Sequence, residues 1–84
     1  MEQKQVVTRS LSVIASEIRK DWKNVNYAAK PYLDAMSSLD TIDDNYYADS
    51  GKSIVSYFLC NASSYRGENA KRIKKELKKM AGLK

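Results

Sequence analysis

Histidine is absent from this 84-residue sequence, and cysteine occurs once, at Cys60. Histidine is the commonest general base in enzymes and the commonest protein ligand of transition metals. Its absence removes the usual machinery of acid–base catalysis, and one cysteine cannot complete a zinc site built from cysteine and histidine. A single thiol also excludes an internal disulfide, which fits a reducing compartment such as the cytoplasm.

Long apolar runs are absent as well. The apolar runs that do occur are only a few residues long, as in Tyr57–Cys60. A transmembrane helix needs about 20 consecutive apolar residues, which no part of this sequence supplies. The N-terminal Met-Glu-Gln-Lys-Gln lacks the apolar stretch of a secretory signal. With three glycines, one proline and 43% hydrophobic residues, the composition is that of a folded chain. We therefore expect a cytoplasmic protein without a membrane partner.

Apolar residues recur with the spacing of an α-helix in four stretches, and no stretch shows the strict alternation of a β-strand. The first predicts a helix over about residues 11–22, with Ser10 as its N-cap. The second predicts a helix over about residues 31–39, because Pro31 is tolerated only in a first turn.

The third stretch follows Asp49 and Ser50, either of which can cap a helix. It carries the broadest apolar face, as expected for the central helix of a small bundle, and we expect Trp22 to pack against it. The Arg66-Gly67 pair then breaks the chain, since glycine readily adopts left-handed backbone angles. A fourth helix with a narrow apolar seam follows.

These stretches predict an all-α fold, a compact bundle of three or four helices without a sheet. Residues 1–9 are polar and lack a period, so we expect them to form a flexible N-terminus. Residues 10–84 contain no long linker and no repeat, and we expect them to form a single helical domain.

Residues 40–50 are rich in aspartate, asparagine and serine, which favour turns and helix caps. Their spacing does not match the calcium loop of an EF-hand. Gly51-Lys52-Ser53 is similar to the end of a phosphate-binding P-loop, but Tyr46 stands where that loop requires its first glycine. We therefore predict no metal site, no cofactor and no catalytic residue, and we do not expect an enzyme.

Tyr46 and Tyr47 are adjacent in this polar segment. Adjacent side chains rarely both face a core, so we expect one ring to anchor the loop and the other to be exposed, where it could contact a protein partner. Cys60 falls in the apolar run of the third helix, and we expect it to be a buried packing residue.

The positive charge is concentrated at one end of the chain. Residues 66–84 carry eight lysines and arginines against two glutamates, whereas residues 1–65 have a net charge of −1. Basic residues around a narrow apolar seam form a surface that attracts phosphate oxygens. The predicted nucleic-acid-binding residues are Arg66, Lys71, Arg72, Lys74, Lys75, Lys78 and Lys79. The alternative interpretation is a solvated helix whose charge keeps the protein soluble; a helix-turn-helix arrangement fits only loosely.

Three further stretches carry a resemblance: EIRKDWKNVNYAA at residues 17–29, PYLDAM at residues 31–36, and DSGKSIV at residues 49–55, which leads on to the turn at residues 66–68. With these motifs the chain resembles small uncharacterised proteins of phages and conjugative elements of Gram-positive bacteria. The resemblance covers about residues 10–80 and transfers no catalytic residue. It implies a bacterial host cell, in which accessory proteins of this kind regulate the element's DNA or block a host function.

Two functional hypotheses follow. The first is a non-enzymatic binding module of a phage or mobile element whose basic C-terminal helix engages nucleic acid or a nucleoprotein. The second is a protein inhibitor of a host factor, such as a defence nuclease, with contacts from the acidic loop and from Tyr46 and Tyr47. A structural protein acting as a homo-oligomer is a third possibility, and the sequence leaves the oligomeric state open.

Overall fold

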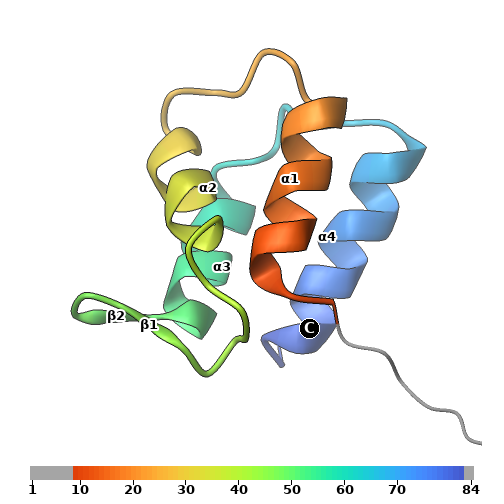
Figure 1. Cartoon of the computed structure of the whole chain (residues 1–84). Helices are drawn as coiled ribbons and strands as arrows, with labels where there is room; N and C mark the ends of the chain where they lie inside the picture. The colour runs from red at the N-terminus through yellow and green to blue at the C-terminus, as the bar shows by residue number, and fades with distance from the viewer. Residues whose placement is uncertain (1–8, 83–84) are drawn as a thin grey trace, which may run out of the picture.

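Four helices make up most of the described part of the chain. A computed structural model of the chain describes residues 9–82. The elements are α1 (Leu11–Asp21), α2 (Lys30–Met36), β1 (Asn45–Tyr46), β2 (Asp49–Ser50), α3 (Gly51–Cys60) and α4 (Glu68–Met80). The chain direction alternates from each helix to the next, and α1 packs antiparallel against α4 (Figure 1). The prediction of a mostly helical bundle is therefore confirmed. The expected flexible N-terminus lies outside the described residues, except for Arg9.

The prediction of a fold without a sheet is wrong, because β1 and β2 form a small antiparallel hairpin. Asn45 pairs with Ser50 and Tyr46 with Asp49, so the turn consists of Tyr47 and Ala48. Tyr47 adopts a positive φ of 57°, which is uncommon for a residue other than glycine, asparagine or aspartate. Strands of two residues are too short for alternation to appear, and this turn lacks the Asn-Gly or Asp-Gly signal of a hairpin.

Local sequence explains where the helices begin. The hydroxyl of Ser10 accepts a hydrogen bond from the backbone N–H of Val13, and the hydroxyl of Ser50 accepts one from Ser53. Both bonds satisfy backbone donors that would otherwise lack a partner in the first turn, which confirms the predicted caps. Pro31 lies in the first turn of α2, where its missing N–H is not needed.

The apolar faces of the four helices meet in one core. Phe58 of α3 is fully buried, and Trp22, which follows α1, lies edge-on to it with ring centroids 6.3 Å apart. Trp22 also stacks on the buried ring of Tyr65 at 5.0 Å. The predicted packing of Trp22 against the third helix is thus confirmed. None of the helices in residues 9–82 combines the length and apolar character that crossing a membrane requires.

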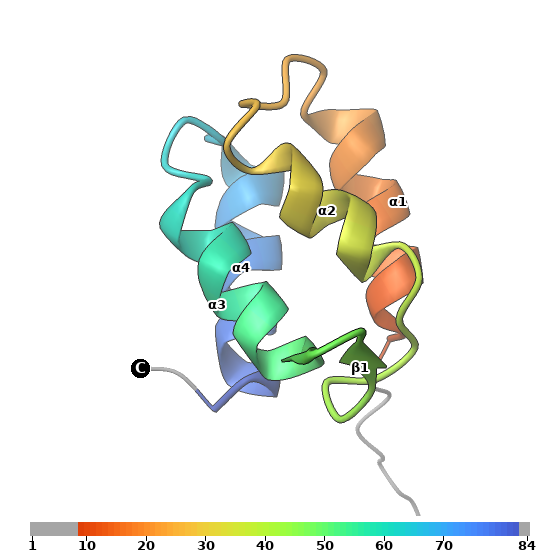
Figure 2. The ribbon, with the colours of Figure 1, turned by 90° about the vertical axis from the view of Figure 1, so that its left-hand side faces the viewer.

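Gly51 belongs to the packing of the hairpin and not to a phosphate-binding loop. A Cβ atom at this position would stand 2.7 Å from the carbonyl oxygen of Ile42, so only glycine lets the two backbones approach this closely. The Gly51 N–H donates to the carbonyl of Asp44 at 2.7 Å. The loop before the hairpin is therefore held against the start of α3 (Figure 2).

Candidate nucleic-acid interface

The local sequence of α4 separates its apolar residues from its basic ones. Ala70, Ile73 and Leu77 are buried against the core. Gly67 precedes the helix with a φ of 117°, and Gly82 follows it with a φ of 70°, two positive values that favour glycine. The helix is therefore delimited at both ends, and its buried side is fixed by three residues at helical spacing.

The basic residues of α4 share one outer face. A helix advances about 100° per residue, so the six cations cover an arc of about 160° opposite the buried side. In order around the helix they are Lys74, Lys78, Lys71, Lys75, Lys79 and Arg72. All are exposed except Lys74, which is half-buried. Glu68, in the first turn, is the one acidic side chain of α4 within the same arc. We call Lys71, Lys75, Lys78 and Lys79 the outer lysines.

The outer lysines differ from the other predicted cations in their contacts. Arg72 donates to a carboxylate oxygen of Glu17, and Lys74 donates to the backbone carbonyl of Tyr65 at 2.6 Å. Arg66, in the loop before α4, reaches the carbonyl of Ser63 at 3.5 Å. Within residues 9–82, none of the outer lysines forms an ion pair with a carboxylate.

A charged network that the sequence did not predict joins α1 to the edge of α4. Arg9 donates to Glu17 at 2.6 Å and to Glu76 at 2.6 Å, and Glu17 also accepts from Arg72. The pKa of Glu17 is lowered, first by the hydrogen bond from Arg9 and then by the one from Arg72. The pKa of Arg9 is raised by its hydrogen bonds to Glu76 and Glu17. Arg9 and Glu76 are 67 positions apart, so no local pattern could have paired them.

Lys74 occupies the opposite edge of the basic arc, beside the buried ring of Tyr65. Its ammonium lies 5.8 Å from the centre of that ring. Burial lowers the pKa of Lys74, and the positive charges of Lys78 and Arg66 lower it further. The structure therefore divides the seven predicted residues into the four outer lysines, an arginine tied to α1, and the Lys74 and Arg66 pair beside Tyr65.

The tyrosine pair behaves as the sequence predicted. Tyr46 is half-buried and packs against the core, while Tyr47 at the hairpin turn is 89% exposed. The two rings meet edge-on with centroids 4.8 Å apart. The hairpin lies at the start of α3, on a different side of the molecule from α4 (Figures 1 and 2). The two predicted binding surfaces are thus not brought together.

The predicted burial of Cys60 is wrong, because its side chain is exposed. Cys60 follows Phe58 by two residues, a rotation of about 200° around the helix that places it opposite the core. In the part of the chain that the structure describes, no group of three histidine, cysteine, aspartate or glutamate side chains is placed to hold a metal ion.

Comparison of the chain with protein-family models, with curated proteins and with solved structures gives no match. The function proposed below therefore depends on the charge and the geometry of residues 9–82 themselves, together with the sequence motifs described above.

Proposed function

We propose that this protein is a small non-enzymatic binding module of a phage or mobile element, and that the outer lysines of α4 bind the phosphates of nucleic acid or of a nucleoprotein. The observation that carries the proposal is the set of four exposed lysines on one continuous helix face without an ion-pair partner among residues 9–82. The genetic setting rests on the resemblance carried by residues 17–29, 31–36 and 49–55.

The arrangement of these lysines is unfavourable in the isolated protein. Lys71 and Lys75, Lys75 and Lys79, and Lys75 and Lys78 stand three or four positions apart, where side chains on a helix are neighbours. Like charges at such spacings destabilise a helix by about 0.2–0.5 kcal/mol per pair. Phosphate groups laid along this face would remove the repulsion and release the counterions of the nucleic acid.

The same residues favour contacts to the phosphate backbone over recognition of particular bases. Lysine presents one compact charge, which suits contacts to phosphate, whereas the planar groups of arginine, asparagine and glutamine are shaped for paired hydrogen bonds to base edges. The arginine of α4, Arg72, is held by Glu17, and the side-chain amide of Asn69 donates to Asp21 at 3.3 Å. We therefore propose a binding mode with little sequence preference.

The test is a titration of labelled duplex and single-stranded oligonucleotides, followed by fluorescence anisotropy over a series of salt concentrations. The logarithm of the affinity should fall with the logarithm of salt concentration, by a slope of about 0.9 for each duplex phosphate bound. Changing all four outer lysines to glutamine should weaken binding strongly and reduce this slope by about 0.9 for each phosphate that the variant no longer binds.

The matched control changes Lys20, Lys23, Lys30 and Lys52 to glutamine. These lysines are exposed on other parts of the fold, and the control lowers the net charge by the same amount. It should bind more weakly than the wild type only to the extent of the general charge effect, and it should keep the salt slope. Equal losses of affinity in the two variants would show that α4 has no special role.

A second function is favoured by one observation, the exposure of Tyr47 at the tip of a hairpin that carries one aspartate, Asp49, and no lysine or arginine. An exposed aromatic ring supplies contact area at low entropic cost. If the purified protein binds no nucleic acid even at low salt, an inhibitor of a host protein becomes the better proposal. It should then form a stoichiometric complex that survives nuclease treatment and is abolished in Tyr47→Ala.

A further inference from the structure

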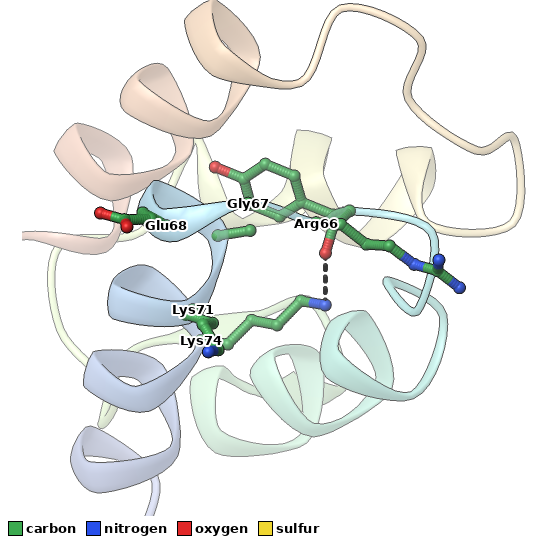
Figure 3. A pocket seen from close by; sticks show the side chains of 7 residues that line it. Arg66, Gly67, Glu68, Lys71 and Lys74 are labelled. Atoms are coloured by element: carbon green, nitrogen blue, oxygen red, sulfur yellow. Dashed lines mark hydrogen bonds between the residues drawn. The ribbon is translucent and has the colours of Figure 1, made fainter.

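A hollow of about 400 Å³ lies where the loop after α3 turns into α4 (Figure 3). Arg66 lines it from the loop, with its guanidinium on the side away from Glu68, and Lys71 and Lys74 line it from the helix, while Tyr65 and Ala70 supply apolar wall. This volume falls within the range of about 300–1,000 Å³ that is typical of small-molecule sites. The hollow therefore combines space for a ligand with cations from two different parts of the chain.

The charge around this hollow is unbalanced. Three cations line it, and Glu68 is its one acidic lining residue. The Glu68 carboxylate points away from the ammonium of Lys74 (Figure 3). Within residues 9–82, none of the three cations forms an ion pair with a carboxylate. The residues that line the hollow thus carry two more positive charges than negative ones.

Lys74 is held in a fixed position for such a ligand. Its ammonium donates to the Tyr65 carbonyl at 2.6 Å, a bond that locates the group but does not neutralise it. Burial and the nearby positive charges of Lys78 and Arg66 lower its pKa, which means that holding a charge at this position carries a free-energy cost. An ammonium retains donors beyond the one used here. An anion in the hollow would offset this cost and accept those remaining bonds.

We propose that the hollow binds a phosphate monoester, either as a free nucleotide or as the phosphorylated end of a nucleic-acid strand. A monoester carries about −1.5 to −2 charges near pH 7 and matches the excess of two, whereas a backbone diester carries one. The start of α4 has no side-chain cap, and its dipole contributes in the same direction as the cations. The inference rests on the proposed function, because Lys71 belongs both to the outer lysines and to the hollow.

The test compares oligonucleotides of one sequence that end in a 5′-phosphate, a 3′-phosphate or hydroxyl groups only. We expect one phosphorylated form to bind about tenfold more tightly than the hydroxyl form, the effect of one additional charged hydrogen bond. The variant Arg66→Gln/Lys71→Gln should lose this preference; both side chains are exposed, so the fold should be retained. The control variant Lys75→Gln/Lys79→Gln also removes two positive charges, but from residues of α4 that do not line the hollow. It should bind all three oligonucleotides more weakly and keep the preference for the phosphorylated end.

A titration with adenosine monophosphate distinguishes the two sources of the monoester. Shifts of the backbone amide resonances of residues 66–74 on titration with adenosine monophosphate would support a free nucleotide as ligand. A preference for phosphorylated ends without such shifts would support a strand end. Equal affinity for all three oligonucleotides, together with unshifted resonances, would overturn the inference. Failure of the hydroxyl-ended strand to bind would instead overturn the proposed function, so the two can fail separately.

Discussion

The two sides of α4 carry different chemistry although they belong to the same 13 residues. On the inner side, Ala70, Ile73 and Leu77 are buried, and at its edge Arg72 and Glu76 bond to Glu17 and Arg9. On the outer side, the outer lysines form no ion pair with a carboxylate among residues 9–82. Charge on one helix is therefore divided between residues that hold the fold together and residues that are available to a partner.

The number of basic residues therefore does not identify a binding surface. The sequence gives no reason to separate Arg72 from the outer lysines, yet in the structure Arg72 donates a hydrogen bond to Glu17 of α1. A surface ion pair restricts the arginine at its position and reduces the charge it offers to a ligand. The difference between the two sides can be tested by substitutions whose expected effects on stability range from large to negligible.

The largest effect on stability is expected on the inner side of α4. Leu77→Ala should lower the free energy of unfolding by roughly 2–5 kcal/mol, because Leu77 is fully buried and the substitution leaves a cavity. Such a loss is a large part of the stability of a small domain, which is typically about 5–15 kcal/mol. Urea unfolding followed by circular dichroism measures it. The adjacent and exposed Lys78→Ala is the control and should change stability by less than about 0.5 kcal/mol; similar values for both would contradict the division of α4 into two sides.

An intermediate effect on stability is expected for the ion pairs that join α1 to the edge of α4. Glu17→Gln should cost about 1 kcal/mol at pH 7, since it weakens charged hydrogen bonds that are partly exposed and so partly screened. The folded-state pKa of Glu17 is lowered from an unfolded value of 4.5, so its contribution is complete above about pH 4.5 and is lost as the pH falls through the folded-state value. The stability curves of wild type and variant should therefore converge in acid. The exposed Asp43→Asn is the control, and a constant gap at all pH values would show that Glu17 acts through packing alone.

The smallest effect is expected at Cys60, which lies on the outer side of α3. Cys60→Ala should change the free energy of unfolding by less than about 0.5 kcal/mol, as for other surface substitutions. Nucleic-acid affinity should be unchanged, because the proposed surface belongs to α4. Labelling by a thiol reagent in the native state should be rapid. Protection of the thiol until global unfolding would show that this face of α3 is covered.

Helix position and composition of the core were largely predictable from the sequence. The spacing of Ala70, Ile73 and Leu77 placed the buried side of α4, and Ser10 and Ser50 placed the starts of two helices. The hairpin at residues 45–50 was missed, because pairs of two residues carry no periodic signal. The second helix ends at Met36, before the predicted boundary at residue 39, since side-chain spacing continues into the turn that follows.

The amino-acid sequence alone shows which residues are basic and which are apolar, and its helical period shows that one helix separates the two kinds. That information is local, because a helix repeats every 3.6 residues and its faces can be derived from spacing alone. The folded structure sets which cations are engaged, because the contacts of Arg9 with Glu76 and of Arg72 with Glu17 join residues 67 and 55 positions apart. It also brought Arg66, Lys71 and Lys74 around one hollow, because the turn at Gly67 folds the loop back against the helix. Contacts between distant segments depend on how the helices pack against one another, and the periodicity within one helix contains no information on this packing.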